Sequence, residues 1–241
     1  MSQKVVCLMP TLGRFRIAER SISFFLAQTY ENKELVVYNQ SPVPMIADFP
    51  QVKVVNVHRE FSGLSEVYTE ALKFCDGDLI NMWDDDNGAF PWLLEDTIRH
   101  KTRKGAKSEK SWVWSQEKLT TGQNLLEPSI VFDIDVIREI GFTPGKSFVH
   151  TKWFYHLYHG GELQHIPEDV MMPGLVYCWG EAGSGCWHIS CTSNESQGFE
   201  GFKNHSKDFG TDGVVHRVNV MEWYDKVTKC HPAIRTRLGL S

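Results

Sequence analysis

The chain has 241 residues, of which 41% are hydrophobic and 23% are charged, and it carries a formal net charge of -5. These values are close to the average for soluble globular proteins, so they exclude a disordered or fibrous chain. The mild negative charge gives no overall support for nucleic-acid binding, and the length predicts one α/β domain that covers residues 1–241.

The first part of the chain alternates between short apolar runs and amphipathic segments. Hydrophobic periodicity predicts strands at residues 4–9, 34–38, 52–57 and 79–83, and helices at residues 14–28 and 63–74. We expect Pro10 to open a turn after the first strand. The prolines of residues 39–50 predict a segment without regular structure between the second and third strands.

Strands that alternate with helices predict a Rossmann-like, mostly parallel sheet that is flanked by helices. In such sheets, ligands bind beyond the carboxyl ends of the strands. Three polar segments follow predicted strands and are therefore expected at one edge of the sheet: PTLGR at 10–14, NQSP at 39–42 and DDDN at 84–87.

The second part of the chain is less regular. We predict helices at residues 91–104, 133–142 and 152–161, the last of them ended by glycine, and short strands at 112–115, 129–132 and 174–179. Residues 193–213 are rich in Gly, Ser and Asn without a period, which indicates either a flexible loop near a site or a linker.

A basic run follows the 91–104 helix. A solvated loop is the favoured interpretation of such a run, and a grip on the phosphates of a nucleic acid is the alternative. The run consists of Arg99, Lys101, Arg103, Lys104, Lys107 and Lys110.

The cysteines and the absence of a targeting segment bear on location. The apolar stretch before Pro10 is too short for a signal peptide or a membrane anchor, and no other segment approaches a membrane span. Six cysteines without a secretory signal predict free thiols in the cytoplasm. Cys178, Cys186, His188 and Cys191 crowd together, but their spacing fits no common zinc pattern, so we favour buried thiols over a structural zinc site.

Three consecutive aspartates end the strand at 79–83. Neighbouring carboxylates repel one another unless something positive lies between them. The Asp-x-Asp pair of Asp84 and Asp86 at the mouth of a sheet is suited to Mg²⁺ or Mn²⁺, which bind one or two carboxylates together with substrate phosphates. A solvated acidic turn is the alternative.

Two stretches of the chain resemble the family 2 glycosyltransferases of the GT-A fold. Residues 5–34 are similar to the opening of that family, in which a strand leads into P-T-x-x-R and a later helix ends in a Q-T-Y segment. Residues 63–87, GLSEVYTEALKFCDGDLINMWDDDN, resemble the segment that leads into its Asp-x-Asp motif. The resemblance implies a nucleotide-sugar-binding half at 1–100 and an acceptor half at 101–241.

The resemblance also implies roles for individual residues. Pro10, Thr11 and Arg14 would lie around the base and ribose of the donor, with Asn39 and Ser41 at the base and Gly63 and Leu64 near the nucleotide. Asp84 and Asp85 would contact the donor, and Asp84 and Asp86 would bind the metal, with His188 as a further metal ligand. Trp179 and Trp187 are interpreted as core residues or as stacking surfaces for a sugar or base.

The sequence departs from the family at three places. Asn39 replaces an aspartate against the base, and Tyr68 and Thr69 replace an Arg-Asn pair, so UDP is only the default nucleotide. The Glu-Asp pair that supplies the catalytic base is missing. His150 is our candidate base, with an ordinary polar residue at a helix start as the alternative, and Glu168 and Asp169 rank below it.

These patterns favour a metal-dependent glycosyltransferase that moves a sugar from a nucleotide-diphosphate donor, a UDP-sugar by default, to an acceptor hydroxyl. The acceptor is a glycan, a small molecule or a hydroxylated base in nucleic acid. The alternatives are a nucleotidyltransferase, and a degenerate module that binds nucleotide sugars but has lost its base. Oligomeric state and stereochemical outcome have no signal in the sequence.

Overall fold

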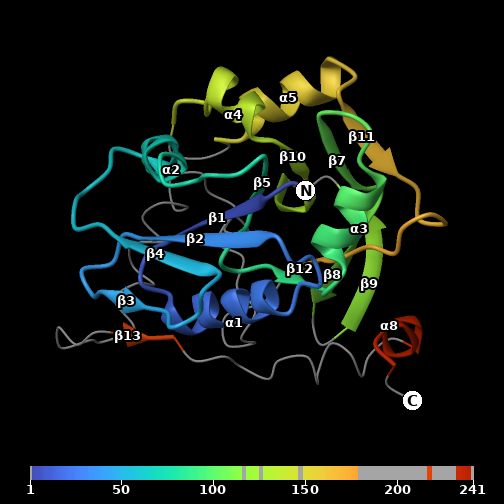
Figure 1. Cartoon of the computed structure of the whole chain (residues 1–241), viewed down its shortest axis with the longest axis horizontal. Helices are drawn as coiled ribbons and strands as arrows, with labels where there is room; N and C mark the ends of the chain where they lie inside the picture. Colours follow the sequence, from blue (N-terminus) through green and yellow to red (C-terminus); the bar gives the residue numbers. More distant parts are fainter. Residues whose placement is uncertain are drawn as a thin grey trace.

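The computed structural model describes residues 2–115, 118–124, 127–145, 149–178, 216–218 and 232–239. The predicted loop at 193–213 and the residues Trp179, Cys186, Trp187, His188 and Cys191 lie outside these ranges. Figure 1 shows a central sheet with helices on both sides and a second, smaller sheet next to it.

The central sheet has seven strands in the order β11-β7-β10-β5-β1-β2-β4. Only β10 runs antiparallel to its neighbours β5 and β7, and the other pairs are parallel. The mostly parallel α/β sheet predicted from the sequence is therefore confirmed. The bounds are β1 (Val5–Thr11), β2 (Lys33–Asn39), β4 (Val52–Asn56), β5 (Leu79–Met82), β7 (Gly105–Ser108), β10 (Val131–Asp133) and β11 (Leu163–Ile166).

Helices cover both faces of this sheet because the strand side chains alternate between them. Cys7 and Met9 point into a core shared with Phe25 of α1 (Phe15–Leu26). Leu8 belongs to the other core, together with Trp153. That core involves α2 (Leu64–Leu72), α4 (Ile134–Ile140) and α5 (Thr151–His159), which lie opposite α1 in Figure 1.

The smaller sheet packs beside the end of β5. Its order is β6-β12-β8-β9, formed by β6 (Gly88–Ala89), β12 (Leu175–Cys178), β8 (Lys110–Ser115) and β9 (Lys118–Gln123). The short strand β6 begins two residues after Asp86, so the acidic stretch connects the two sheets. The remaining elements near this sheet are α3 (Leu93–His100), the 3-10 helix η1 (Glu127–Ser129) and α8 (Pro232–Arg237).

Two predictions that rested on prolines were wrong: the end of the first strand before Pro10 and the absence of regular structure at 39–50. Strand β1 does not end before Pro10 but continues to Thr11. Pairing with β5 stops at Leu8, so the missing N–H of Pro10 faces the side on which no strand partner remains. The proline-rich segment also contains a short strand, β3 (Met45–Ile46), which pairs with β13 (His216–Arg217) far along the chain.

The basic run does not form one patch. The helix predicted at 91–104 ends at His100, and β7 begins at Gly105. Lys107 lies in β7 with no exposed surface, which contradicts both interpretations that we considered for it. Its neighbours in the sequence are engaged by carboxylates: Lys101 pairs with Asp133 at 2.6 Å, Lys104 with Glu162 at 3.6 Å and Arg99 with Glu95 at 2.5 Å.

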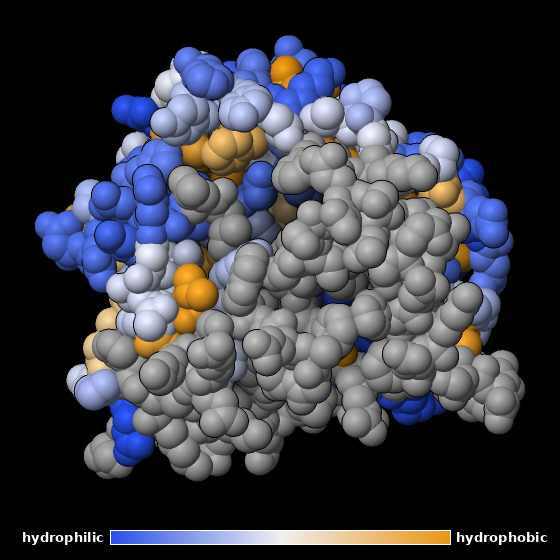
Figure 2. Space-filling view, turned by 180° about the vertical axis from the view of Figure 1, so that it is seen from behind, coloured by the Kyte–Doolittle hydropathy of each residue, from blue (hydrophilic) through white to orange (hydrophobic). Residues whose placement is uncertain are grey.

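The exposed hydrophobic side chains are scattered. On the face shown in Figure 2, the hydrophobic residues of the described part lie as separate spots among hydrophilic ones. Tyr155, Tyr158 and Val170 are the most exposed large hydrophobic residues among those described, each at 52%. Within the same ranges, no helix has the length and apolar character needed to cross a membrane.

Candidate active site

Four parallel strands bring their carboxyl ends to one edge of the central sheet. Thr11 at the end of β1 lies opposite Asn39 at the end of β2, and Asn39 lies opposite Asn56 at the end of β4. On the other side of β1, Met82 at the end of β5 lies opposite Leu8. The three polar segments predicted at this edge therefore lie at strand ends on one side of the sheet, although Pro10, Thr11 and Asn39 are the last residues of their strands and do not follow them.

Helix α1 holds the backbone of the acidic stretch that follows β5. Ser21 Oγ donates a hydrogen bond to the carbonyl oxygen of Asp84 at 2.8 Å, and a guanidinium nitrogen of Arg20 donates to the carbonyl oxygen of Asp86 at 3.0 Å. The indole N–H of Trp83 in turn donates to Ser21 Oγ at 2.8 Å. These contacts fix the path of the chain, so the carboxylates are held at the edge of the sheet.

Arg14 supplies the positive charge that the run of aspartates needs. Its side chain is only 4% exposed and forms a buried ion pair with Asp85. A second guanidinium nitrogen lies 3.4 Å from a carboxylate oxygen of Asp86. Asp85 also accepts a hydrogen bond from Thr11 Oγ1 at 2.8 Å. The end of β1 and the start of α1 thereby clamp the middle aspartate.

Asp84 is placed differently from Asp85. Burial raises the pKa of Asp85, and the charge of Arg14 partly offsets that rise. Burial also raises the pKa of Asp84 well above its usual range, and the negative charges of Asp86 and Asp85 add to the rise. The side chain of Asp84 keeps some exposure. The charge of Arg14 opposes this rise only as the smallest of these effects, so a cation near Asp84 would favour its ionised form.

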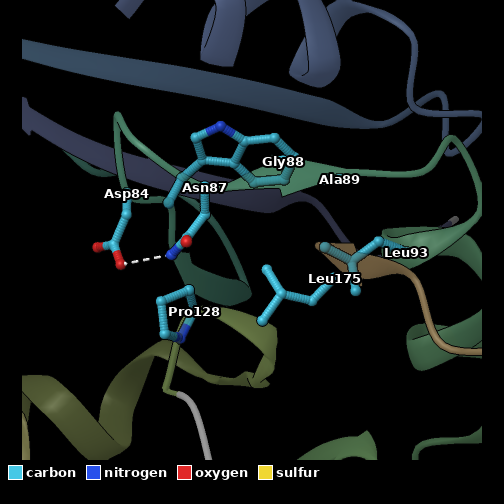
Figure 3. Close-up of a pocket in the computed structure, with 8 residues that line it drawn as sticks. Asp84, Asn87, Gly88, Ala89, Leu93, Pro128 and Leu175 are labelled. Atoms are coloured by element: carbon cyan, nitrogen blue, oxygen red, sulfur yellow. Dashed lines mark hydrogen bonds between the residues drawn. The ribbon is translucent and has the colours of Figure 1, made fainter. Parts of the chain in front are cut away.

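A small pocket opens beside Asp84, between the two sheets. Its lining combines polar side chains from the acidic stretch with apolar residues from the smaller sheet, α3 and η1. Figure 3 shows Asp84 and Asn87 on one side and Leu175 and Leu93 on the other, with Pro128 below. Asn87 Nδ2 donates a hydrogen bond to Asp84 Oδ2 at 2.9 Å, which orients the carboxylate at the pocket.

Asn39 and Ser41 form a closed network at the end of β2. The amide nitrogen of Asn39 donates to the carbonyl oxygen of Val43 and to Asn56 Oδ1, each at 2.9 Å, and its Oδ1 accepts from the backbone N–H of Ser41. Ser41 Oγ accepts from the N–H of Val43. Both amide donors of Asn39 are occupied, so its predicted contact with a base would have to use Oδ1 or a rearranged network.

Gly63 and Leu64 lie at the start of α2, on the edge that follows β4. Gly63 is the N-cap of α2 and Leu64 is its first residue, and among the described residues no hydrogen bond or ion pair joins either of them to the aspartates. One turn later, Tyr68 is buried, and burial together with the charges of Asp84 and its neighbours raises the pKa of the phenol well above 10. Tyr68 therefore connects α2 to the acidic group.

His150 lies at the start of α5, as the sequence predicted. Its ring packs edge-on against Tyr68, with the ring centroids 4.7 Å apart, and also against Phe142 and Trp153. Its Nδ1 is enclosed and has no hydrogen-bond partner among the described residues. Burial lowers the pKa of His150 to about 3, so the imidazole is a weak base at neutral pH. Its role as the base stays a prediction.

Several residues near the site were not anticipated from the sequence. Arg20 and Ser21 hold the acidic stretch, but no motif marks them; Asn87 belongs to the predicted polar segment at 84–87, but its contact with Asp84 was not predicted. Glu127 lies within electrostatic range of Asp84 and Tyr68, since its charge raises the pKa values of both. The sequence predicted a strand at 129–132 and no element just before it, so it did not indicate that Glu127 lies in a 3-10 helix near the acidic stretch.

The metal prediction receives partial support from these residues. No group of three or more His, Cys, Asp or Glu within the described ranges is arranged to hold a metal ion. A donor-bound Mg²⁺ or Mn²⁺ needs only one or two carboxylates in addition to phosphate oxygens. After burial, the charge of Asp86 is the largest cause of the raised pKa of Asp84, and a cation between the two carboxylates would relieve their repulsion. His188 lies outside the described residues.

Comparison with known proteins gives a family and a fold. The glycosyl transferase family 2 sequence model matches residues 6–128, just over half of the chain. No match to the sequence was found among curated proteins. The fold is similar to that of residues 1–349 of S. aureus TarS in complex with UDP-GlcNAc, with a TM-score of 0.58 and 13% identity; the match covers 99% of this chain and 73% of that one.

A second similar structure is the mannosyltransferase PcManGT from Pyrobaculum calidifontis in complex with GDP-Man and Mn²⁺. Its TM-score is 0.57 at 14% identity, and the match covers 100% of this chain and 73% of that one. In another structure of TarS residues 1–349, the match covers 72% of this chain and 60% of that one, so this chain spans less than two thirds of that relative. The sequence match, the mostly parallel sheet and the acidic edge agree: the chain belongs to glycosyl transferase family 2, a family of glycosyltransferases.

Proposed function

We propose that this chain transfers a sugar from a nucleoside-diphosphate donor to an acceptor hydroxyl and that a divalent cation is required. The observation that carries the proposal is the set of three aspartates at the carboxyl end of β5: Asp85 is clamped by Arg14 and Thr11, Asp86 pairs with Arg14 at 3.4 Å, and Asp84 has no ion pair among the described residues. The similar proteins bind UDP-GlcNAc or GDP-Man, which supports a donor of this class. A UDP-sugar is the default donor, and the cytoplasm remains the predicted location.

Asp84 and Asp86 are the residues that would hold the cation. When bound, Mn²⁺ or Mg²⁺ would neutralise the charge that develops on the departing diphosphate. Asp84 is oriented by Asn87, and the backbones of Asp84 and Asp86 are held by α1, so the two carboxylates are positioned before a donor arrives. His188 is proposed as a further ligand, as the family resemblance implies.

The nucleotide is proposed to lie along the edge formed by β1, β2 and the start of α2. Pro10 and Thr11 end β1 and Arg14 follows it, and the guanidinium of Arg14 would provide positive charge next to the phosphates even while it is paired with Asp85. The remaining proposed contacts with the nucleotide are Asn39, Ser41, Gly63, Leu64 and Asp85.

The pocket beside Asp84 has a cavity volume of about 10 Å³, which is room for about one water molecule and too little for a sugar ring. It lies next to the proposed metal ligands, and Leu93 and Leu175 form its apolar wall. We therefore propose that the sugar lies outside this pocket, on the open side of the acidic edge.

The test compares Asp86→Ala with Asp135→Ala. Asp135 is an exposed residue of α4, and its carboxylate is 88% exposed, so it serves as a matched loss of one carboxylate. We expect Asp86→Ala to lose Mn²⁺-dependent binding of UDP, measured by calorimetry, and to lose turnover of UDP-GlcNAc and GDP-mannose. Asp135→Ala should retain both.

The reaction products distinguish a glycosyltransferase from a nucleotidyltransferase. Sugar transfer or hydrolysis releases a nucleoside diphosphate, whereas nucleotidyl transfer releases pyrophosphate. Binding of UDP with Mn²⁺ but no turnover of either donor would instead favour a degenerate binding module. Unchanged Mn²⁺-stimulated turnover in Asp86→Ala would contradict the proposed role of the acidic edge.

A further inference from the structure

The small pocket beside Asp84 has an apolar wall and a polar wall. The apolar wall is formed by the side chains of Trp83, Ala89, Leu93, Pro128 and Leu175. The indole N–H of Trp83 already donates to Ser21 Oγ at 2.8 Å, so it is not available to the pocket. The polar wall is formed by the side chains of Asp84 and Asn87 (Figure 3).

The amide group of Asn87 is only half satisfied. Asn87 is 5% exposed, and its Nδ2 donates to Asp84 Oδ2 at 2.9 Å. Its Oδ1 is enclosed and has no hydrogen-bond partner among the described residues. Figure 3 shows the amide nitrogen turned toward Asp84 and the amide oxygen on the side of Leu175. A buried acceptor without a partner costs about 1–3 kcal/mol, so the oxygen calls for a donor that the protein does not supply.

The backbone on both sides of Asn87 is fixed. The carbonyl oxygen of the residue before it, Asp86, accepts a hydrogen bond from Arg20 at 3.0 Å. The residue after it, Gly88, pairs with Val176 of β12, and an added Cβ at Gly88 would lie 3.2 Å from Val176 Cβ. Strand β6 is therefore packed closely against β12. A rearrangement that gave the amide oxygen another protein partner would have to break these contacts.

The size of the pocket selects its occupant. A volume of about 10 Å³ is room for about one water molecule. Cavities that stay dry are apolar, whereas the amide oxygen of Asn87 and the carboxylate of Asp84 both accept hydrogen bonds here. One water molecule can donate to both acceptors. A divalent cation such as Mg²⁺ needs about six oxygen ligands, and the two side chains of this pocket cannot supply them.

We propose that this pocket is a binding site for one water molecule, which donates one hydrogen bond to Asn87 Oδ1 and one to the carboxylate of Asp84. Asn87 is then a positioning residue. Together with the water, it holds one side of the Asp84 carboxylate and leaves the other side for the cation. The positioning role rests on the proposed function, because it concerns the metal, whereas the water site does not depend on it.

A crystal structure of the metal-free wild type tests the water site. We expect one ordered water within about 2.5–3.0 Å of Asn87 Oδ1 and of a carboxylate oxygen of Asp84. In crystals soaked with Mn²⁺ and UDP, the anomalous signal of manganese should appear between Asp84 and Asp86 and not in the pocket. A wild-type pocket without a water, or with manganese in it, would overturn the inference.

Calorimetry of Mn²⁺ binding tests the positioning role, in the presence of UDP, or of GDP if only GDP binds. Asn87→Leu is close to the original side chain in shape and has no polar atoms. It should raise the Kd of Mn²⁺ roughly 10–100-fold, because this is the usual effect of removing a hydrogen-bond partner of a metal ligand.

Gln51→Leu is the matched control for the loss of a carboxamide. Gln51 is exposed and precedes β4, at the opposite edge of the sheet, so this variant should keep the wild-type Kd. Thermal melts of both variants show whether each is folded at the temperature of the titration. A merely structural role of Asn87 would lower Tm and leave the Kd of Mn²⁺ unchanged.

The outcomes are distinguishable from failure of the proposed function. A wild type that binds no Mn²⁺ with either UDP or GDP would overturn the proposed function and the positioning role of Asn87, while the metal-free crystal would still decide the water site. A wild type that binds Mn²⁺ and nucleotide overturns the inference alone if Asn87→Leu keeps the wild-type Kd of Mn²⁺, or if the pocket holds no water.

Discussion

The buried pair of Arg14 and Asp85 gives a sharp test of how the acidic edge is held. Both side chains are 4% exposed, so neither charge has water to compensate it. Arg14→Met removes the guanidinium but keeps an unbranched apolar side chain of similar length. Asp85 then remains buried without its partner, and Asp86 loses a positive group that lies 3.4 Å away.

The expected loss of stability is large. Removing one partner of a buried ion pair costs about 3–5 kcal/mol, because the other charge stays behind uncompensated. For chains of this size, each kcal/mol lowers Tm by roughly 2–4 °C, so Arg14→Met should melt roughly 6–20 °C below the wild type. The double variant Arg14→Met with Asp85→Asn should be more stable than Arg14→Met alone, since it also removes the stranded charge.

The pH dependence has a definite sign. In Arg14→Met, the folded-state pKa of Asp85 loses the one charge that lowers it and rises further above its unfolded value of about 3.9. A carboxylate with a raised folded-state pKa destabilises the fold when it is ionised, and this cost disappears as the pH falls through the folded-state pKa. The free-energy gap between variant and wild type should therefore narrow between pH 7.5 and pH 5.

Urea denaturation of the wild type, Arg14→Met and the double variant at both pH values measures these quantities, with the slope m checked for constancy. Two results would refute the reasoning: a double variant no more stable than Arg14→Met, or a gap that stays constant or widens in acid. Either would mean that Arg14 is not the counter-charge of the acidic stretch.

Two further changes test the edge and the junction between the sheets. Asn39→Asp should lower the free energy of unfolding by roughly 2–6 kcal/mol in urea titrations, because the new carboxylate would face two acceptors that the amide now satisfies. This loss is expected although the family resemblance implies an aspartate at this position. An unchanged urea midpoint would contradict the prediction. Gly174→Ala should destabilise by about 1–3 kcal/mol, since an added Cβ would lie 2.6 Å from Leu93 Cα. Gly122→Ala, whose nearest contact is at 4.0 Å, is the control and should melt within a few degrees of the wild type.

The sequence predicted the strands that are buried on both faces. Strands such as β1 lie between other strands and are buried on both faces, so they appear as continuous apolar runs, here VVCLM. β7, in contrast, reads GAKS, which has little preference for a strand, and tertiary packing overrides that preference by burying the stem of Lys107. The antiparallel β10 has only three residues, too few to reveal its direction.

The candidate site could also be predicted only in part. Its place at the strand ends was predictable, because parallel strands end at one edge and polar segments follow three of them. The pairing of Arg14 with Asp85 was not, since 71 residues separate them and no local pattern links their charges. Glu127 had no signal for a similar reason: η1, which contains it, is held against β5 by hydrogen bonds of Asn81 that only the fold brings together.

The three aspartates differ in role: Asp85 is held in a buried ion pair with Arg14, whereas Asp84 and Asp86 are the proposed metal ligands. Arg14 pairs with Asp85 and Asp86, and Arg20 reaches the carbonyl oxygen of Asp86, so Asp84 is the aspartate without an ion pair among the described residues. If all three carboxylates are ionised, negative charge is in excess around Asp84, and burial raises the cost of that state. A diphosphate that approached this edge alone would be repelled. A divalent cation cancels the excess and supplies positive charge to the phosphates, so donor and metal should bind as a pair, with little affinity for the nucleotide when the metal is removed. Arg14 need not release Asp85 for this to happen, and the scaffold stays intact through the reaction.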